Sequence, residues 1–448
     1  MLKKPLKKSK RLLVTTILIL LSLLAINSVY SQTYSGYLFA HFTGESTDGE
    51  QIYFAASTDG LHWTDCNNSQ PVLISNVGEM GVRDPSLIRS ADGSRFWLIA
   101  TDLRIASGKG WDVAQHSGST SLVIWESTDL VNWSQPRLAN VAGAIPDAGC
   151  AWAPEAIYNE DTGNYVVYWA TISPLDGIDK ARIYYATTTD FRSFTSPQLY
   201  INRPDTQGII DTQILKVENS TYRYYRASGD GQITFEGSNS ILGYWTDLGN
   251  ISHLGLTGSD VEGPILYKFN GQNNWGLMVD QYATGGGYLP LLSSDLSSTG
   301  NFRVLDSSEY SLGTSHKRHG GILNITAAEL DRIRSQWPND PVSRIQSYYD
   351  QTMYVRHYDF DARIDADVSP YEDSQWRIVP GLADANGYIS FESVNYPGYF
   401  LRHYSYDLEL AQNDDSSVFA EDATFGIVPG LADSGWSVSY THLRAHET

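Results

Sequence analysis

The phrase Ser57-Thr58-Asp59-Gly60-Leu61-His62-Trp63 decides the fold of this chain, because versions of it return four more times before residue 303. The later copies are 127–133, 188–194, 238–245 and 293–302, and the aromatic residues that end successive copies are 70, 61, 51 and 57 residues apart. Each copy follows an aromatic, β-branched run such as Ile52–Phe54, which predicts a strand and then a turn. Repeats of about this length are typical of β-propeller blades.

A second series of short segments runs in step with the first and places a polar residue just before Ile or Leu. Its members begin at Asp84, Glu155, Asp211, Glu262 and His319, with spacings of 71, 56, 51 and 57 residues. In a propeller the innermost strand of each blade starts at the central channel, so we expect these five side chains to converge there. The alternative is that Asp-Pro and Gly-Pro only form turns at strand starts.

Crowded carboxylates repel one another, so at least one of their pKa values must rise. A glycosidase needs such a pair, because one carboxyl group must stay protonated near neutral pH while another stays ionised. The second series therefore favours glycoside hydrolysis over a purely structural role.

The phase of the two series also predicts how the ring closes. Strands at 36–43 and 51–56 precede the first inner segment, whereas 319–325 has no later partners. Joining them builds a fifth blade from both chain ends, which removes the free edges of the ring. We therefore predict an all-β fold with a five-bladed propeller over residues 32–337. It ends in a helix from Thr326 to Trp337, in which Thr326 and Glu329 have the spacing of a capping box.

A second repeat follows the Pro-rich break at 338–341. The pattern at 354–358 returns 46 residues later at 400–404 with a shared Arg-His-Tyr, and Val-Pro-Gly-Leu-Ala-Asp at 379–384 returns 49 residues later. All-β repeats of this length predict a β-trefoil domain over residues 342–448. The third copy starts at Trp436 and lacks the expected aromatic and Arg-His pattern, so we expect a truncated third lobe.

Residues 1–31 predict a secretory signal peptide. Six Lys or Arg residues lie within 1–11, an apolar run fills 12–27, and the small residues Val29 and Ser31 offer a cleavage site. We therefore expect a secreted protein, periplasmic or extracellular, without membrane contact after cleavage. The alternative is an uncleaved anchor helix.

The composition indicates which classes of partner the protein can bind. A net charge of −20 argues against nucleic acid, and 29 Tyr and 12 Trp residues suit stacking on sugar rings. Cys66 and Cys150 are the only two cysteines, and we expect them to remain unpaired. We also expect a monomer.

Over residues 34–325 the chain resembles glycoside hydrolase family 43. The resemblance rests on Arg83–Ile88, Trp152–Pro154, Val261–Pro264 and Arg318–Gly320. It implies a five-bladed propeller with an inverting mechanism. It makes Asp84 the general base that activates water, Glu262 the general acid, and Asp211 the carboxylate that orients this acid and raises its pKa.

The same resemblance implies the remaining site residues. Arg83, Trp152, Glu155 and His319 would line the substrate pocket, and His319 would hold a water molecule or a calcium ion in the channel. No cofactor is expected beyond such a structural calcium. Thr212 stands where proline is usual and Glu155 where aspartate is common, so Glu155 remains an alternative to Asp211 for the supporting role.

Residues 343–440 are similar to the arabinose-binding module of arabinofuranosidase B, carbohydrate-binding module family 42. That resemblance implies one furanose pocket from His357, Tyr358 and Asp373. It implies a second from the corresponding residues of the next lobe: His403, Tyr404 and Asp422. The alternative is that these side chains only pack the lobes.

Together these features predict an α-L-arabinofuranosidase that removes arabinofuranose side chains from plant polysaccharides. Its partner would be an arabinose-containing polysaccharide or oligosaccharide. The alternatives on the same fold are a β-xylosidase, an exo-β-galactosidase and an endo-arabinanase, because a fold does not fix a substrate. A different class is a non-catalytic arabinose-binding lectin.

Overall fold

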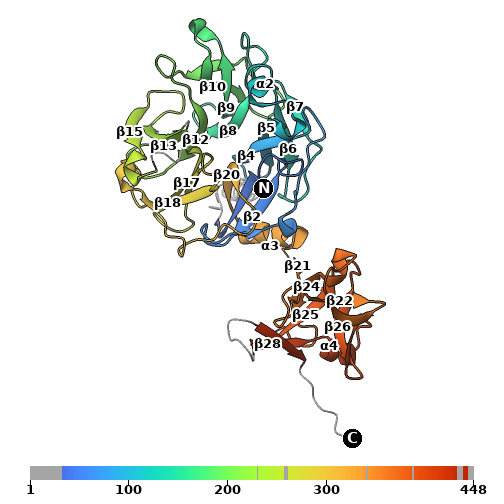
Figure 1. Ribbon diagram of the computed structural model, residues 1–448. Coiled ribbons are helices and arrows are strands. Elements are labelled where there is room, and N and C mark those ends of the chain that lie inside the picture. The colour runs from blue at the N-terminus through green and yellow to red at the C-terminus, as the bar shows by residue number, and fades with distance from the viewer. Residues whose placement is uncertain are drawn as a thin grey trace, which may run out of the picture.

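The computed structural model describes residues 33–229, 231–256, 261–339, 342–385, 388–430 and 437–441. The predicted signal peptide at 1–31 lies outside these residues. The described chain is nearly all β, with a ring of five four-stranded sheets followed by a curled nine-stranded sheet (Figure 1). Within the described ranges, no helix is long and apolar enough to cross a membrane.

Each blade is an antiparallel sheet whose innermost strand is given first here. Blade 1 consists of β4 (Val82–Arg89), β5 (Phe96–Asp102), β6 (Leu122–Ser127) and β7 (Arg137–Ala139). Blade 2 consists of β8 (Trp152–Asn159), β9 (Asn164–Ser173), β10 (Lys180–Thr188) and β11 (Gln198–Ile201). Blade 3 consists of β12 (Ile210–Lys216), β13 (Tyr224–Gly229), β14 (Ile233–Ser238) and β15 (Thr246–Asn250). Blade 4 consists of β16 (Glu262–Lys268), β17 (Trp275–Asp280), β18 (Tyr288–Ser293) and β19 (Arg303–Val304).

The fifth blade joins both ends of the domain, as the phase of the repeats predicts. It consists of β20 (Arg318–Ile325), β1 (Gly36–Phe42), β2 (Tyr53–Ser57) and β3 (Thr64–Asp65). Strand β20 pairs with β1 along its length, with Gly36 opposite Ile325 and Phe42 opposite Arg318. The inner strands β4, β8, β12, β16 and β20 then contact one another in sequence around the ring.

A buried carboxylate locks this closing blade. Asp65 on β3 accepts hydrogen bonds from the backbone N–H groups of Thr314 and Ser315, both at 2.8 Å. The Lys317 ammonium lies 2.5 Å from Asp65 Oδ1, and both side chains are almost fully buried. The segment just before β20 is thereby tied to the outermost strand of the same blade.

The repeated phrase turns the chain after the third strand of each blade, as predicted. Ser57 Oγ accepts hydrogen bonds from the N–H groups of Asp59 and Gly60, and Asp59 Oδ1 accepts from the next two N–H groups. Ser127 and Asp129 repeat this arrangement in blade 1. The phrase is therefore a structural device at the outer rim.

The helix α3 (Ala327–Gln336) follows β20 and confirms the predicted capping box. Thr326 and Glu329 exchange the two expected hydrogen bonds, and Leu330 and Ile333 pack into the core of the closing blade and blade 1. The Glu329 carboxylate also holds Arg89 at the far end of β4, at 2.7 and 2.9 Å. The other α-helices in the described ranges are short, α2 (Trp111–His116) and α4 (Ser417–Asp422). Cys66 and Cys150 are buried free thiols, as predicted.

The second domain is a curled antiparallel sheet around Trp376, Phe391, Leu401, Leu410 and Phe425. Its strands are β21 (Val342–Ser343), β22 (Tyr354–Tyr358), β23 (Asp361–Asp365), β24 (Trp376–Pro380), β25 (Tyr388–Ser393), β26 (Tyr399–Tyr404), β27 (Asp407–Gln412), β28 (Phe425–Pro429) and β29 (Ser437–Thr441). The repeated sequences fall on equivalent strands, with Arg-His-Tyr on β22 and β26. The trefoil itself stays a prediction, and most of the expected third lobe lies outside the described residues.

Candidate active site

The inner strands share one irregularity close to where each of them begins. The pairing register shifts between Arg83 and Ser86 in β4, Trp152 and Glu155 in β8, Ile210 and Thr212 in β12, and Glu262 and Ile265 in β16. In the closing blade, His319 of β20 is the residue left without a pairing partner where the register with β1 shifts. Such bulges re-aim side chains and often lie next to functional sites. We call this end of the inner strands the hub.

The bulges use left-handed backbone conformations, which non-glycine residues adopt rarely. Asp84 and Asp211 both have φ of 51°, and Gly263 has φ of 55°. A Cβ on Gly263 would lie 2.8 Å from Cγ of His319, so glycine is what allows β16 to approach β20. Strained positions of this kind cluster at functional sites.

Asp84, Asp211 and His319 meet at the hub. The imidazole Nδ1 of His319 lies 3.5 Å from Asp84 Oδ1 and 3.5 Å from Asp211 Oδ2. Asp211 Oδ2 also accepts a hydrogen bond from the Gly263 N–H at 2.9 Å, directly after Glu262. Two predicted carboxylates from different blades therefore share one histidine, and a backbone contact joins the third to them.

Glu262 is the carboxyl group whose protonation is most strongly perturbed. Burial, followed by the negative charges of Asp211 and Asp280, raises its pKa to about 8. Its Oε1 accepts a hydrogen bond from Arg318 Nη2 at 3.2 Å, and Arg318 Nε is 2.6 Å from Asp280 Oδ2. The guanidinium thus bridges Glu262 and a fully buried aspartate.

The hub carboxylates differ in how far they reach toward solvent. The side chains of Asp84 and Glu262 keep 14% and 21% of their surface exposed, whereas Asp211 keeps 6%. The first two can therefore touch a substrate, and the third lies behind them.

A hydroxyl group fixes the orientation of Asp84. Thr101 Oγ1 accepts a hydrogen bond from the Ala153 N–H, so its own proton is directed at Asp84 Oδ2, 2.8 Å away.

Glu155 occupies a different place from the other acidic residues. It stands two residues beyond the bulge residue Ala153, at the register position that Ser86 occupies in β4. Ser86 Oγ donates to its Oε2 at 2.6 Å, and burial raises the pKa of Glu155 to about 7. The described contacts join Glu155 to blade 1 and do not join it to Glu262.

Arg83 and Trp152 lie around an exposed tryptophan of α2 at the hub. The Arg83 guanidinium lies 4.6 Å from the Phe42 ring and 4.9 Å from the Trp111 ring, and it pairs with Glu50 at 3.4 Å. Trp152 meets Trp111 edge-on at 6.1 Å. The predicted pocket residues therefore contribute an aromatic wall with a fixed cation beside it.

Three further residues of the hub, Arg318, Asp280 and Thr101, were not predicted to have a role there. Asp280 is the last residue of β17 and pairs with Glu262, and Thr101 is the penultimate residue of β5 and pairs with Arg83. The sequence does hold a signal for Asp280, because this polar residue directly follows the apolar run 275–279. The predicted series contains only residues at the starts of inner strands, whereas Asp280 and Thr101 lie near the ends of second strands.

The geometry around His319 gives limited support for a metal. One imidazole and two carboxylates meet there, whereas Ca²⁺ takes 6–8 oxygen ligands. Across the described ranges, no group of three or more His, Cys, Asp or Glu side chains is arranged to hold a metal ion. The calcium ion stays a prediction.

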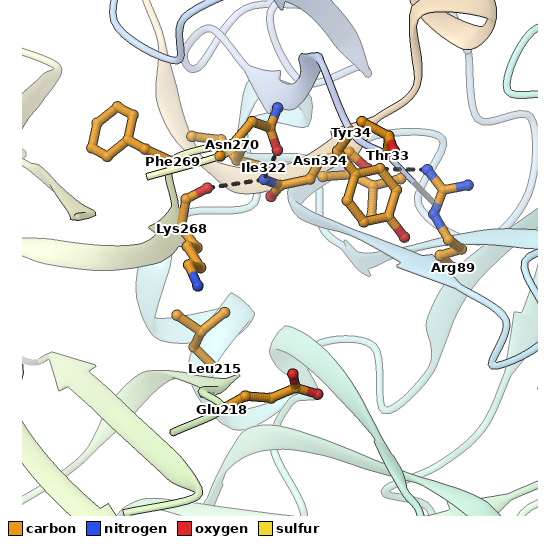
Figure 2. Close-up of a pocket in the computed structure, with 12 residues that line it drawn as sticks. Thr33, Tyr34, Arg89, Leu215, Glu218, Lys268, Phe269, Asn270, Ile322 and Asn324 are labelled. Carbon is orange, nitrogen blue, oxygen red and sulfur yellow. Dashed lines mark hydrogen bonds between the residues drawn. The ribbon is translucent and has the colours of Figure 1, made fainter. Parts of the chain in front are cut away.

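A pocket of about 720 Å³ lies at the other end of the inner strands, away from the hub (Figure 2). It is lined by Arg89, Lys268 and Asn324, the ends of β4, β16 and β20, together with Tyr34 and Glu218. Asn324 Nδ2 donates to Asn270 Oδ1 at 2.7 Å and to the Lys268 carbonyl at 2.9 Å. None of the predicted site residues lines it.

The second domain gathers the predicted residues of its first lobe in a pocket of about 280 Å³. His357 Nε2 contacts Asn395 Oδ1 at 2.9 Å, and Asn395 Nδ2 donates to Asp373 Oδ1 at 2.8 Å. Tyr358 lines the same pocket and is half exposed. The asparagine belongs to the second sequence repeat, so both repeats contribute to this pocket.

The second repeat keeps the contacts that Arg356 makes with Asp373 and Tyr358 in the first, and it differs at its histidine. Arg402 Nη2 lies 3.6 Å from Asp422 Oδ2, and the Arg402 guanidinium lies 4.7 Å from the ring of Tyr404. His403 meets Tyr406 edge-on. In the described part of the chain no hydrogen bond joins His403 to Asp422, so the structure does not bring these predicted residues together as it does in lobe one.

Several characterised proteins are similar to parts of this chain. An α-L-arabinofuranosidase of Bifidobacterium longum subsp. longum is 32% identical over 215 residues, which cover 44% of this chain and 20% of that protein. An extracellular exo-α-(1→5)-L-arabinofuranosidase of Streptomyces avermitilis is 50% identical over 81 residues, 18% of this chain and 17% of that protein. This chain therefore matches a fifth or less of the length of each relative. An exo-β-1,3-galactanase structure from Clostridium thermocellum covers 82% of this chain and 88% of its own, with 12% identity and a TM-score of 0.40, a similarity too remote to bear on function.

Two family models match the two domains. Residues 343–445 match the α-L-arabinofuranosidase B domain. Residues 32–331 match the probable glycosyl hydrolase domain related to glycoside hydrolase family 43, over most of the chain. The propeller with its hub of carboxylates thus corresponds to this probable glycosyl hydrolase domain, and the chain belongs to the glycoside hydrolase family 43-related family.

Proposed function

We propose that this protein is a secreted, inverting α-L-arabinofuranosidase that removes arabinofuranose side chains from plant polysaccharides. The observation that carries the proposal is the hub, where Glu262, a partly exposed carboxyl group with a raised pKa, lies in one cluster with Asp84, a carboxylate that Thr101 orients. The α-L-arabinofuranosidase B domain and the arabinofuranosidase relatives favour arabinose as the sugar. The relative named extracellular supports secretion.

The hub residues divide the reaction between them. Asp84, oriented by Thr101, takes a proton from a water molecule, and the resulting hydroxide attacks the anomeric carbon. Glu262 gives its proton to the glycosidic oxygen as the bond to the anomeric carbon breaks. Attack and departure take place on opposite faces of the ring, so the configuration inverts.

The electrostatics suit these roles. A pKa of about 8 keeps Glu262 mostly protonated at neutral pH, which a general acid requires. The negative charge of Asp211 contributes more to that shift than the charge of Asp280, and its side chain is buried behind Glu262 and Asp84. After proton transfer, the new charge on Glu262 faces the Arg318 guanidinium.

The second domain would hold the polymer through its first-lobe pocket. His357, Asn395 and Asp373 offer donors and acceptors for vicinal hydroxyl groups, and Tyr358 offers an apolar ring face. A small site with a few fixed polar groups and aromatic walls is typical of sugar recognition.

Hydrolysis assays on two substrates test the assignment. We expect the protein to hydrolyse both 4-nitrophenyl α-L-arabinofuranoside and an arabino-oligosaccharide. Asp84→Asn should lose both activities by about 10²–10⁴-fold. Glu262→Gln should lose far more on the oligosaccharide, because nitrophenolate leaves without protonation. Asp247→Asn, on the outermost strand of blade 3, is the matched control.

Three results would overturn the proposal. They are an inactive wild type on both substrates, an equal loss on both substrates for Glu262→Gln, and a first product with retained anomeric configuration in ¹H NMR spectra. Retention of configuration would mean that a carboxylate attacks the sugar as a nucleophile instead of acting as a base on water.

A further inference from the structure

The fourth copy of the outer phrase, 238–245, departs from the other copies in a way that hydrolysis at the hub does not explain. Ser240 stands where the other copies have aspartate, and the loop is one residue longer than the first three copies. Ser238 Oγ lies 2.6 Å from the Tyr244 carbonyl oxygen, which ties the lengthened loop to the end of β14. The Tyr244 side chain is 86% exposed, unusual for a large aromatic residue.

Behind this loop lies a pocket of about 360 Å³ between blades 2 and 3, which we call the rim pocket. Its walls are the rings of Tyr185, Tyr200, Tyr244 and Trp245, and its polar groups are Arg226 and Glu236. The volume is near the lower end of the usual range for small-molecule sites, about 300–1,000 Å³.

The polar groups of the rim pocket are a buried ion pair. Arg226 Nε and Nη2 lie 2.8 and 2.6 Å from Glu236 Oε2, and Arg203 Nη2 lies 3.6 Å from the same oxygen. Over the described residues, every contact of this carboxylate runs to Oε2, which leaves Oε1 as an acceptor for a ligand. The Arg226 guanidinium also lies 4.3 Å from the Trp245 ring, which orients it.

This chemistry suits a neutral, polyhydroxylated ligand. Aromatic faces cover the C–H face of a sugar ring, and a carboxylate and a guanidinium bind its hydroxyl groups. An anionic ligand would face Glu236 in a protein of net charge −20. A cationic ligand would face Arg226.

We propose that the rim pocket is a second carbohydrate-binding site on the catalytic domain, which holds a neutral sugar residue of the polysaccharide main chain. This inference rests on the proposed function for the identity of the polymer. Tyr244 lines the pocket and is almost fully exposed, so its ring is accessible to a polysaccharide. Blade 3 also carries Asp211 on its inner strand, so one blade serves both polymer binding and chemistry.

The test measures binding without hydrolysis. The full chain with Glu262→Gln and His357→Ala, which also removes the first-lobe contact, is run through native gels containing arabinan, arabinoxylan or arabinogalactan. We expect at least one polymer to retard it and Tyr244→Ala to weaken that binding by about 3–10-fold, the worth of one aromatic contact. Tyr349→Ala, at an equally exposed tyrosine of the second domain, is the control.

A second measurement separates binding from folding. Tyr244→Ala alone should leave the melting temperature and the hydrolysis of 4-nitrophenyl α-L-arabinofuranoside unchanged and raise KM on the polymer without changing kcat. Unchanged retardation by every polymer, or an equal loss for Tyr349→Ala, overturns the rim pocket as a sugar site. Either result would instead favour a protein partner at the rim pocket, or a purely structural role for its ion pair. Tyr244-dependent binding by a protein that cleaves no arabinofuranoside would overturn the proposed function and keep the rim pocket.

Discussion

Replacing Asp211 by Asn should move the alkaline limb of the pH–activity profile to lower pH. Burial, then the charges of Asp211 and Asp280, raise the pKa of Glu262 from 4.5 to about 8. A general acid works only while protonated, so the wild type should lose activity as the pH rises through about 8. Without the Asp211 charge the ionised form of Glu262 is less disfavoured, so its pKa falls and activity is lost earlier.

The size of the shift follows from the geometry. The Asp211 carboxylate touches the N–H directly after Glu262, which places the two carboxyl groups in neighbouring positions. Unit charges about 6–8 Å apart interact by about 2–3 kcal/mol at an effective dielectric constant of about 20. That energy corresponds to about 1.5–2 pKa units. The limb should therefore move to about pH 6–6.5, because burial and Asp280 still hold the pKa above 4.5.

The measurement is kcat/KM on an arabino-oligosaccharide across the pH range, which reports the pKa values of the free enzyme. The asparagine oxygen can still accept from the Gly263 N–H, so the geometry is kept, and Asp247→Asn controls for the substitution itself. Glu155→Gln tests the other candidate for the supporting role. An unmoved limb in Asp211→Asn, together with a shifted one in Glu155→Gln, would refute the reasoning.

Three further predictions concern stability and the second domain. Asp65→Ala should lower the free energy of unfolding by about 3–5 kcal/mol, because it leaves the buried Lys317 ammonium unpaired; an unchanged urea midpoint would contradict this. Thr326→Ala should cost about 1 kcal/mol through loss of the helix cap, visible as a small drop in melting temperature, whereas Thr326→Ser should retain it. His357→Ala should weaken retention on arabinose-bearing polymers and leave hydrolysis of the nitrophenyl substrate unchanged, and a loss of that hydrolysis would show that the pocket has another role.

Much of the propeller could be predicted because blade repeats leave local signals. The Ser-Thr-Asp turns mark the outer rim through hydrogen bonds between residues two or three apart, such as Asp59 with His62. The closing blade followed from the phase of two series, and the helix start from a capping box. None of these needs a contact between distant residues. The trefoil symmetry stays a prediction.

The residues that meet at the hub were harder to predict, because strand register decides which residues are neighbours. Asp84, Asp211 and His319 meet as predicted, since all three are bulge residues. Glu155 stood in the same numerical series, yet it lies two positions beyond its bulge. Counting residues cannot detect this difference, because a bulge adds residues to one strand and not to its partner. Arg318 and Asp280 were missed for a related reason, because their contacts cross from β20 to the end of β17.

The strand that closes the ring also carries Arg318 and His319, and this has a consequence for the order of events during synthesis. Strand β1 is made first and must wait for β20, about 280 residues later, for its inner partner. At translation rates of about 5–20 residues per second, that wait lasts on the order of 15–60 s. Until it ends, β1 has a bare edge and Glu262 lacks its guanidinium. On the proposed mechanism, a chain that has not yet added β20 would be inactive, and hydrolytic activity would report that the ring has closed.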